Sequence, residues 1–365
     1  MKRSNDRDKK RDTKTVGRRE FLLAAASGLA STYVTGQWKS SRVLAAVSSK
    51  ETAKDVVTPT ADFFIRNHFT TPRISEDSWS LEIDGLVGKP VKLSYSDLLL
   101  SSSVRRPLTL ECAGNLSGGR GVSTAVWSGL PLADLLKQAG IPGGATTVIF
   151  YGADSGEGEG VAPGTHFARA IPIEKAMDPS TLLAYEMNGA PLPPEHGYPL
   201  RALVSGWYGM DSVKWLTRVE VSQEAFKGYF QQERYVALKA NGEKQPITRM
   251  RVNSRFLRPL DGEEIRGNSY GIEGVAWAGE SKVSKVELRF DGSGPWQPAT
   301  LGGVPVPMVW TPWSYVWNVA RPGPYTIEVR ATDDAGNSQP LGRDPDRRDD
   351  YELNTPHRIS VNVKA

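Results

Sequence analysis

The chain contains a single cysteine, Cys112, among its 365 residues. One thiol excludes a disulfide within the chain, and it excludes zinc and iron–sulfur sites that need several thiolates. Four roles remain open for Cys112. These roles are an inert buried thiol, an intermolecular bridge, a nucleophile, and one ligand of a metal that is held mostly by another group.

The length suggests about two domains. A hydrophobic fraction of 39% and ten tryptophans supply enough apolar surface for globular cores, and the 36 glycines and 25 prolines favour strands and loops over long helices. The net charge is +4, and much of the basic excess lies in the first nineteen residues. No basic stripe interleaved with aromatic residues occurs, so we expect no binding to nucleic acid.

The N-terminal segment is typical of an export signal. Arg18 and Arg19 precede an apolar, alanine-rich run, and small residues at 43–46 offer a cleavage site. This pattern predicts a twin-arginine signal peptide over residues 1–46, and therefore a periplasmic protein. The apolar run is shorter than the roughly 20 residues of a membrane span, so we expect no stable span. An amphipathic helix on a basic tail is the alternative. Residues 47–60 are predicted to be a linker.

Residues 61–245 are predicted to form an α+β domain. Strands are expected at 79–85, 105–111 and 147–151 from alternating or continuous apolar patterns, with a loop at 152–156. A capped helical turn is expected at 94–99, and leucine spacing with a terminal glycine predicts a helix over 130–140. Short helices and strands mixed without strict alternation are typical of the α+β class.

Residues 246–365 are predicted to form an immunoglobulin-like β-sandwich. Alternating segments at 284–291, 325–329 and 357–363 are separated by turns rich in glycine, proline and aspartate. This region holds no cysteine, which excludes a disulfide-pinned antibody-type domain. It also holds no evident set of catalytic residues, so we expect a scaffold, with dimerisation as its natural use.

The residues suited to chemistry fall in separate clusters of the first domain, mostly where strands are expected to end. They are Arg66, Asn67, His68, Cys112, Asp154, His196, Arg201, Lys214 and Tyr235. With only four histidines in the chain, a cysteine–histidine hydrolase is a weakly supported possibility. No GxGxxG sequence follows the first strand, and no P-loop, HxxxH motif or paired carboxylates occur.

Five motifs in order carry a family resemblance. They are FFIRNH at 63–68, TLECAGN at 109–115, STAVWSGLPLADLL at 123–136, LLAYEMNGAPLPPEHGYPLR at 182–201 and GMDSVKWL at 209–216. From about residue 63 to its C-terminus, the chain resembles the sulfite oxidase family of molybdopterin-dependent oxidoreductases. The resemblance implies a molybdopterin-binding domain followed by the dimerisation domain of that family, as in bacterial, exported members without a haem domain.

The resemblance also implies residue roles. Cys112 would bind molybdenum through its thiolate, a soft donor that suits this metal. Arg66 and Tyr235 would position the substrate, and with Cys112 they form the expected catalytic set. Arginine and lysine suit the phosphate of the pterin, and aspartate and histidine suit its polar ring edge. The implied cofactor-binding residues are Phe64, Ile65, Arg66, Asn67, His68, Asp154, His196, Arg201, Ser212, Val213 and Lys214.

The implied function is oxygen-atom transfer at a molybdenum–molybdopterin cofactor in its Mo-oxo form, without haem. The enzyme would oxidise sulfite or a related sulfur compound and pass electrons to a c-type cytochrome, as a homodimer. Two alternatives stay open. One is a molybdopterin reductase of a sulfoxide, nitrate or another oxo-substrate, and the other is a non-catalytic exported scaffold or binding protein.

The sequence departs from the family pattern where the anion would bind. Leu116 and Ser117 follow CAGN, where animal and plant sulfite oxidases carry two arginines, and Asp211 precedes Ser212 where arginine and histidine are usual. A further substrate arginine near the C-terminus has no clear match. Candidate replacements for these cations are Arg120, Arg347 and Arg348. Lost charge in an anion pocket weakens binding, so sulfite itself is the least secure part of the prediction.

Overall fold

The computed structural model describes residues 57–158 and 160–364. The predicted signal peptide at 1–46 and most of the predicted linker at 47–60 lie outside the described residues. None of the helices in the described part is long and apolar enough to cross a membrane.

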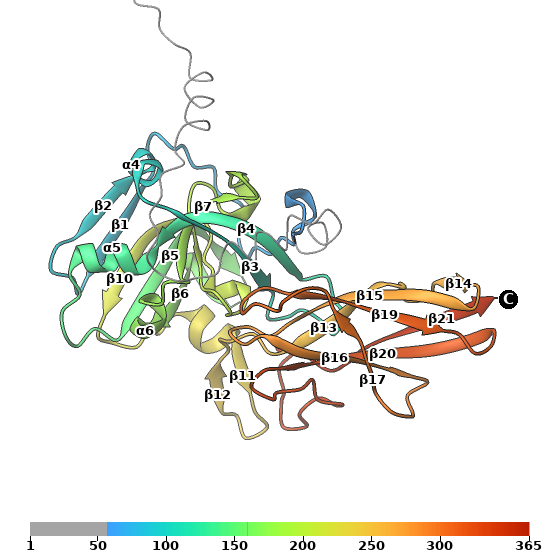
Figure 1. Ribbon diagram of the computed structural model, residues 1–365. Coiled ribbons are helices and arrows are strands. Elements are labelled where there is room, and N and C mark those ends of the chain that lie inside the picture. Colours follow the sequence, from blue (N-terminus) through green and yellow to red (C-terminus); the bar gives the residue numbers. More distant parts are fainter. Residues whose placement is uncertain (1–56, 159, 365) are drawn as a thin grey trace, which may run out of the picture. The chain divides into compact units, whose positions relative to one another are not determined.

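The first of two sheets in the N-terminal region has five strands in the order β2-β1-β10-β5-β6 (Figure 1). Its strands are β1 (Ser80–Gly85), β2 (Val91–Ser94), β5 (Thr147–Gly158), β6 (Val161–Pro172) and β10 (Leu216–Ser222). Strands β1 and β10 are parallel, and the other neighbours are antiparallel. The strands predicted at 79–85 and 147–151 are confirmed as β1 and the first part of β5.

The second sheet has the order β3-β4-β7-β8, and β9 also pairs with β7. Its strands are β3 (Val104–Glu111), β4 (Val122–Pro131), β7 (Leu182–Met187), β8 (Ala190–Pro191) and β9 (Arg201–Leu203). The strand predicted at 105–111 is confirmed as β3, and Cys112 follows its last residue directly. Because β4 lies between β3 and β7, it is buried from Val122 to Leu130.

The helices of this region are short. The α-helices are α4 (Tyr95–Leu100), α5 (Leu132–Ala139) and α6 (Ile173–Ala176). The 3₁₀ turns are η1 (Thr60–Asp62), η2 (Pro194–His196) and η3 (Gly209–Asp211), and η4 (Phe230–Arg234) is a π-helical turn. Both predicted helices are confirmed, and α4 starts at a capping box between Ser94 and Asp97. The region is richer in strand than the α+β prediction implies.

The predicted loop at 152–156 is wrong, because β5 continues to Gly158. Strand β6 supplies backbone hydrogen-bond partners along this stretch, with an irregular register between Tyr151 and Ser155. The paired strand therefore holds glycine and aspartate residues extended, although these residues favour turns when they stand alone. Asp154 consequently projects from a strand at a bulge, where side-chain direction is well defined.

The C-terminal region consists of two sheets. One has the order β13-β15-β19-β18, and the other β14-β21-β20-β16-β17. The first sheet contains β13 (Asn253–Arg258), β15 (Ser269–Trp277), β18 (Thr300–Leu301) and β19 (Thr311–Asn318). The second contains β14 (Glu264–Arg266), β16 (Val283–Phe290), β17 (Gln297–Pro298), β20 (Gly323–Asp333) and β21 (His357–Lys364). The strands predicted at 284–291, 325–329 and 357–363 are confirmed as β16, part of β20 and β21.

Both C-terminal sheets contribute side chains to one hydrophobic core. Ile272 and Trp313 come from the first sheet, and Leu288 and Val329 come from the second. The alternating apolar residues that predicted these strands are therefore the residues that face the shared core. A hairpin of β11 (Val236–Leu238) and β12 (Lys244–Pro246) precedes this region. The domain limits at 60/61 and 245/246 stay predictions.

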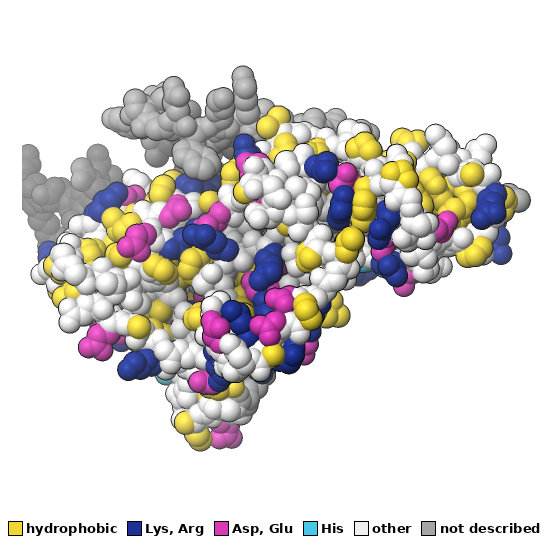
Figure 2. All heavy atoms as spheres, turned by 90° about the horizontal axis from the view of Figure 1, so that it is seen from below, with side chains coloured by type: hydrophobic (Ala, Val, Ile, Leu, Met, Phe, Trp, Pro, Cys, Tyr) yellow, Lys and Arg dark blue, Asp and Glu magenta, His cyan; other side chains and the backbone are white. Residues whose placement is uncertain are grey.

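Basic and acidic side chains are intermixed over the face drawn in Figure 2. On this face, lysines and arginines do not gather into one continuous stripe. A mixed surface of this kind gives no long positive track of the type that binds nucleic-acid backbones.

His357, the first residue of β21, makes the stability of the C-terminal region depend on pH. Its Nδ1 accepts a hydrogen bond from the Phe256 N–H at 3.1 Å. Burial, reinforced by Arg255, lowers the pKa of His357 to about 4. Because the unfolded imidazole titrates near 6.5, this contribution is present above pH 6.5 and is lost as the pH falls through 4.

We therefore expect His357→Asn, whose side-chain oxygen can still accept the Phe256 N–H, to flatten the acid limb of the stability curve. Between pH 7 and pH 5 the wild-type chain should lose about 1–2 kcal/mol more unfolding free energy than the variant. Urea denaturation at both pH values measures the difference. Equal losses in the two proteins would show that His357 does not carry this dependence.

Candidate active site

One cavity gathers the predicted site residues from elements far apart in the sequence. All thirteen predicted residues line it except Ile65, whose side chain is 54% exposed. Sequence reasoning missed part of the wall, which also includes Phe63, Leu110, Ala113, Phe167, Gly209, Met210 and Trp215. Phe63, Ala113 and Trp215 are next to a predicted site residue in the sequence, and for these three adjacency was the available signal.

The Cys112 loop, residues 112–121, connects β3 to β4 and is closed by internal hydrogen bonds. The Cys112 N–H donates to the Gly121 carbonyl at 2.8 Å, and the Gly121 N–H donates to Asn115 Oδ1 at 2.9 Å. A Cβ at Gly119 would lie 2.4 Å from Asn115 Oδ1, so this position needs glycine. The closed turn holds the Cys112 side chain on the cavity wall.

A buried carboxylate next to Cys112 fixes this loop to the C-terminal region. Glu111 is 2% exposed and accepts hydrogen bonds from Asn115 Nδ2 at 3.0 Å, Trp277 Nε1 at 2.8 Å and Asn253 Nδ2 at 3.4 Å. Burial raises the pKa of Glu111 to about 7, against the effect of these three donors. Three donors on one carboxylate restrict the orientation of the residue before Cys112.

Cys112 shares its end of the cavity with Arg66, His68 and Tyr235. His68 Nε2 and the Tyr235 hydroxyl are 2.6 Å apart, and the His68 ring stacks on Phe167 at 5.2 Å. Burial, reinforced by Cys112, raises the pKa of the Tyr235 phenol, which therefore stays protonated at neutral pH. Burial also raises the pKa of the Cys112 thiol, and the Gly114 N–H and Arg66 oppose that rise.

The other end of the cavity holds polar side chains whose hydrogen bonding is incomplete. Asp154 Oδ1 and Arg201 Nε are buried and have no hydrogen-bond partner among the described residues. Burial raises the pKa of Asp154 to about 6 and lowers that of Arg201 to about 9. Burial, reinforced by Arg201, lowers the pKa of Lys214 to about 7. A bound anion would favour the charged forms of Arg201 and Lys214.

Neighbouring contacts hold these cations toward the cavity. Arg201 donates to the carbonyls of His196 at 3.1 Å and Ser212 at 3.0 Å, and its guanidinium lies 5.1 Å from the Trp127 ring centroid. Lys214 donates to the Glu195 carbonyl at 2.8 Å and to Asn67. The donors suit a phosphate, and the open acceptor of Asp154 suits ring N–H groups. The polar residues at this end of the cavity therefore fit the phosphate and the ring edge of a molybdopterin.

A fully buried ion pair lies behind Tyr235. Arg169 Nε and Asp211 Oδ1 are 2.8 Å apart, and both side chains are inaccessible to solvent. Arg169 also donates to the Phe230 carbonyl and, at 3.3 Å, to the Ile247 carbonyl. The Ile247 N–H donates in turn to the Tyr235 carbonyl at 3.0 Å. Asp211, at a position where the resemblance implied a cation, thus binds an arginine from β6.

The three candidate replacement arginines do not line the cavity. Arg120 is exposed on the Cys112 loop, and Arg348 is exposed and donates to the Pro345 carbonyl at 2.7 Å. Arg347 pairs with Asp349 at 2.7 Å and with Glu352 at 2.8 Å. Among the described residues, Arg66 is therefore the cation of the cavity lining whose charge lowers the pKa of both Cys112 and Tyr235.

Two family models and many curated proteins match this chain. Residues 68–230 match the oxidoreductase molybdopterin binding domain, and residues 244–347 match the Mo-co oxidoreductase dimerisation domain. Human mitochondrial sulfite oxidase is 34% identical over 321 residues, which cover 79% of this chain and 58% of the human protein. Nitrate reductase [NADH] 1 of Arabidopsis thaliana is 32% identical over 331 residues, which cover 78% of this chain and 36% of that protein.

A solved structure supports the fold. The sulfane dehydrogenase SoxCD from Paracoccus pantotrophus matches with a TM-score of 0.76 at 24% identity, over 99% of this chain and 96% of that chain. The two matched family models cover both regions of the chain. The chain itself spans little more than half of the length of the human enzyme. The chain belongs to the sulfite oxidase family of molybdopterin oxidoreductases.

Proposed function

We propose that this protein oxidises sulfite or a related sulfur compound by oxygen-atom transfer at a molybdopterin-bound molybdenum. One observation carries the proposal: Cys112, Arg66 and Tyr235 meet at one end of a cavity whose other end has unsatisfied donors and acceptors. When bound, the cofactor supplies a metal that exchanges two electrons and an oxygen atom with the substrate.

The chain's own residues bind the cofactor from both ends. The Cys112 thiolate would be the single protein ligand to the metal, since the described residues contain no cluster of three His, Cys, Asp or Glu side chains. Arg201, Lys214 and Ser212 would bind the phosphate, and Asp154 and His196 the pterin edge. The rest of the cofactor-binding wall would be formed by Phe64, Asn67, His68 and Val213. The Phe64 N–H donates to Ser123 Oγ at 3.3 Å, which holds the Phe64 backbone against β4.

Two residues would orient the substrate. Arg66 contributes positive charge and hydrogen-bond donors for a substrate oxygen. The protonated Tyr235 hydroxyl can donate to the same oxygen, while His68 fixes the position of that hydroxyl through the 2.6 Å contact. Phe167, stacked on His68, helps to hold the imidazole ring in place for this contact.

The proposal also covers the location of the enzyme, its electron acceptor and its assembly. The twin-arginine pattern supports export to the periplasm, and a c-type cytochrome would then accept the electrons. The match of residues 244–347 to a dimerisation domain supports a homodimer. The two sheets around one core support an immunoglobulin-like sandwich for that domain.

A reductase of a sulfoxide, nitrate or other oxo-substrate is the second candidate. Plant nitrate reductases are about as similar to this chain as sulfite oxidases are. Among the described residues, Arg66 and Arg201 are the arginines that line the cavity, and the additional arginines expected for a small dianion do not line it. A non-catalytic scaffold is a third hypothesis, and the retention of Cys112 together with twelve of the thirteen predicted residues in one cavity speaks against it.

The test combines metal analysis with turnover on protein from the native host. We expect near-stoichiometric molybdenum and sulfite-dependent reduction of cytochrome c. Molybdenum without oxidation of any sulfur compound would instead support the reductase. Correctly folded protein without molybdenum would remove the enzymatic proposal.

A further inference from the structure

Two arginines lie together where the Cys112 loop meets the C-terminal region. Arg120 is exposed near the end of the loop, and Arg255 is half-buried on β13. Arg255 Nη1 donates to the carbonyl of Gly119, the residue before Arg120, at 3.4 Å. Neither arginine is among the residues that line the cavity, so the pair is separate from the site assigned to the cofactor and the substrate.

The two positive charges are not compensated by acidic side chains. Neither Arg120 nor Arg255 forms an ion pair with a carboxylate of the described residues. Burial, reinforced by the charge of Arg120, lowers the pKa of Arg255, and no described acidic group opposes this effect. Arg255 Nε is buried and has no hydrogen-bond partner in the part of the chain that the structure describes. Two like charges are therefore held close together, and one buried donor is left open.

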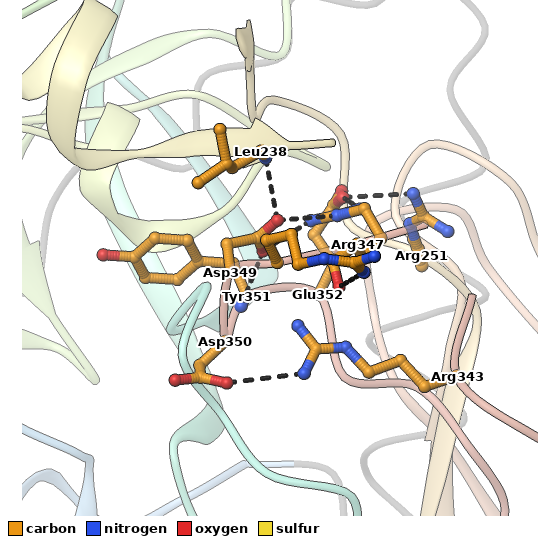
Figure 3. A network of polar contacts seen from close by, with 9 residues as sticks. Leu238, Arg251, Arg343, Arg347, Asp349, Asp350, Tyr351 and Glu352 are labelled. Atoms are coloured by element: carbon orange, nitrogen blue, oxygen red, sulfur yellow. Dashed lines mark hydrogen bonds and ion pairs between the residues drawn. The ribbon is translucent and has the colours of Figure 1, made fainter. Parts of the chain in front are cut away.

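Other arginines of the C-terminal region are compensated. Arg347 pairs with Asp349 at 2.7 Å and with Glu352 at 2.8 Å, and Arg251 also binds Glu352 at 3.0 Å. Figure 3 shows this network, in which each labelled arginine has a carboxylate partner. The uncompensated arginine pair is therefore an exception within its own region.

His357 adds a neutral donor at the same place. Its Nδ1 accepts the Phe256 N–H, so the neutral ring carries its hydrogen on Nε2. A Cβ placed on Gly118 would overlap this ring, which therefore packs directly against the Cys112 loop. The charge of Arg255 helps to lower the pKa of His357, so these two side chains are near each other. Donors from the loop, β13 and β21 thus lie around one place.

Arg201 at the cofactor end of the cavity has the same combination of features. Its buried Nε has no partner among the described residues, and burial lowers its pKa without a described carboxylate opposing it. That position is assigned to a phosphate. Guanidinium groups present planar sets of N–H donors that suit phosphate-like oxyanions, and an acceptor removes the cost of an open buried donor.

We propose that Arg120 and Arg255 form a second oxyanion site, outside the active-site cavity, for a small tetrahedral dianion such as sulfate or hydrogen phosphate. The anion would accept hydrogen bonds from both guanidinium groups and offset their mutual repulsion. Because Arg120 belongs to the Cys112 loop and Arg255 to β13, the bound anion would also tie this loop to the C-terminal region. The site does not depend on the proposed function, since neither arginine takes part in it.

The test follows modification of Arg120 by phenylglyoxal on the metal-loaded protein, with peptide mass spectrometry as the readout. This reagent attacks accessible guanidinium groups, so a bound anion slows the reaction at its own site. We expect saturating sulfate to slow the modification of Arg120 at least about 10-fold relative to chloride at equal ionic strength. Arg321, which is exposed between β19 and β20, should react at the same rate in both salts.

Arg255→Met locates the site, because it keeps most of the side-chain volume and removes the charge. It should weaken the sulfate affinity, measured from the protection of Arg120, about 10-fold or more, the usual effect of one charge-assisted contact. Arg321→Gln removes one exposed positive charge elsewhere and should leave this affinity unchanged. Loss of protection in Arg321→Gln as well would show a general charge effect and overturn the site.

A second variant covers the case in which the half-buried substitution disturbs the fold. Arg120→Gln changes an exposed residue, and calorimetric titration with sulfate should show one binding site fewer than in the wild type. A parallel titration with phosphate identifies which of the two anions binds more tightly. Equal rates of Arg120 modification in sulfate and chloride, or the same number of sulfate sites in Arg120→Gln and wild type, would overturn the proposal.

Discussion

Cys112→Ser should lower turnover by at least about 100-fold while the protein remains folded. Loss of an outer partner of a metal ligand commonly costs 10- to 100-fold, and here the ligand itself changes from a soft thiolate to a hard hydroxyl. We also expect loss of the visible absorption that arises from thiolate-to-metal charge transfer. Steady-state kinetics and absorption spectra of the purified, metal-loaded protein measure both effects.

Ser117→Ala is the matched control for this variant. Ser117 lies in the same loop, outside the cavity, and its hydroxyl contacts that of Thr355 at 2.8 Å. The control should keep both turnover and spectrum. If Cys112→Ser kept the wild-type spectrum in metal-loaded protein, Cys112 would not be a metal ligand.

Arg169→Met should produce the largest loss of stability among single substitutions in the cavity region, about 3–5 kcal/mol of unfolding free energy. The variant leaves the Asp211 carboxylate buried without a counter-charge, and the Phe230 and Ile247 carbonyls lose a donor. Burial already raises the pKa of Asp211, with Arg169 opposing that rise. Urea denaturation of cofactor-free protein measures the cost.

Two companion variants make this result specific. Lys92→Met breaks an exposed pair with Glu82, whose side chains are 66% and 49% exposed, and should cost at most about 1 kcal/mol. Arg169→Met with Asp211→Leu removes both charges and should recover much of the loss. Equal losses from Arg169→Met and Lys92→Met would show that the buried pair contributes no more than a surface pair.

The sequence predicted the strands and the cavity residues unequally well. Strands such as β16 and β21 were predictable because their alternating apolar residues face the shared core. The position of Asp154 was not, since the pairing of β5 with β6 is a tertiary effect that overrides the turn preference of glycine and aspartate. The motifs pointed to residues that the structure brings together in one cavity, although motif order says nothing about side-chain direction, as the exposed Ile65 shows.

Residues distant in sequence account for the remaining misses. Arg255 lies far along the chain from Arg120, and no local pattern connects the two. Arg347 was a candidate substrate cation by type alone. Its acidic neighbours Asp349 and Glu352 were the available signal, because carboxylates two and five residues away can neutralise an arginine within one segment.

The hydrogen bonds of Glu111 have a consequence for the order of events during synthesis. Ribosomes make a chain from its N-terminus, and N-terminal regions generally begin to fold first. Asn253 and Trp277, which hold the carboxylate before Cys112, are made after every residue that lines the cavity. A nascent chain that has released only the first region therefore has an unanchored Cys112 loop. We expect stable cofactor insertion to be a late, post-translational step that requires the C-terminal sheets to be in place.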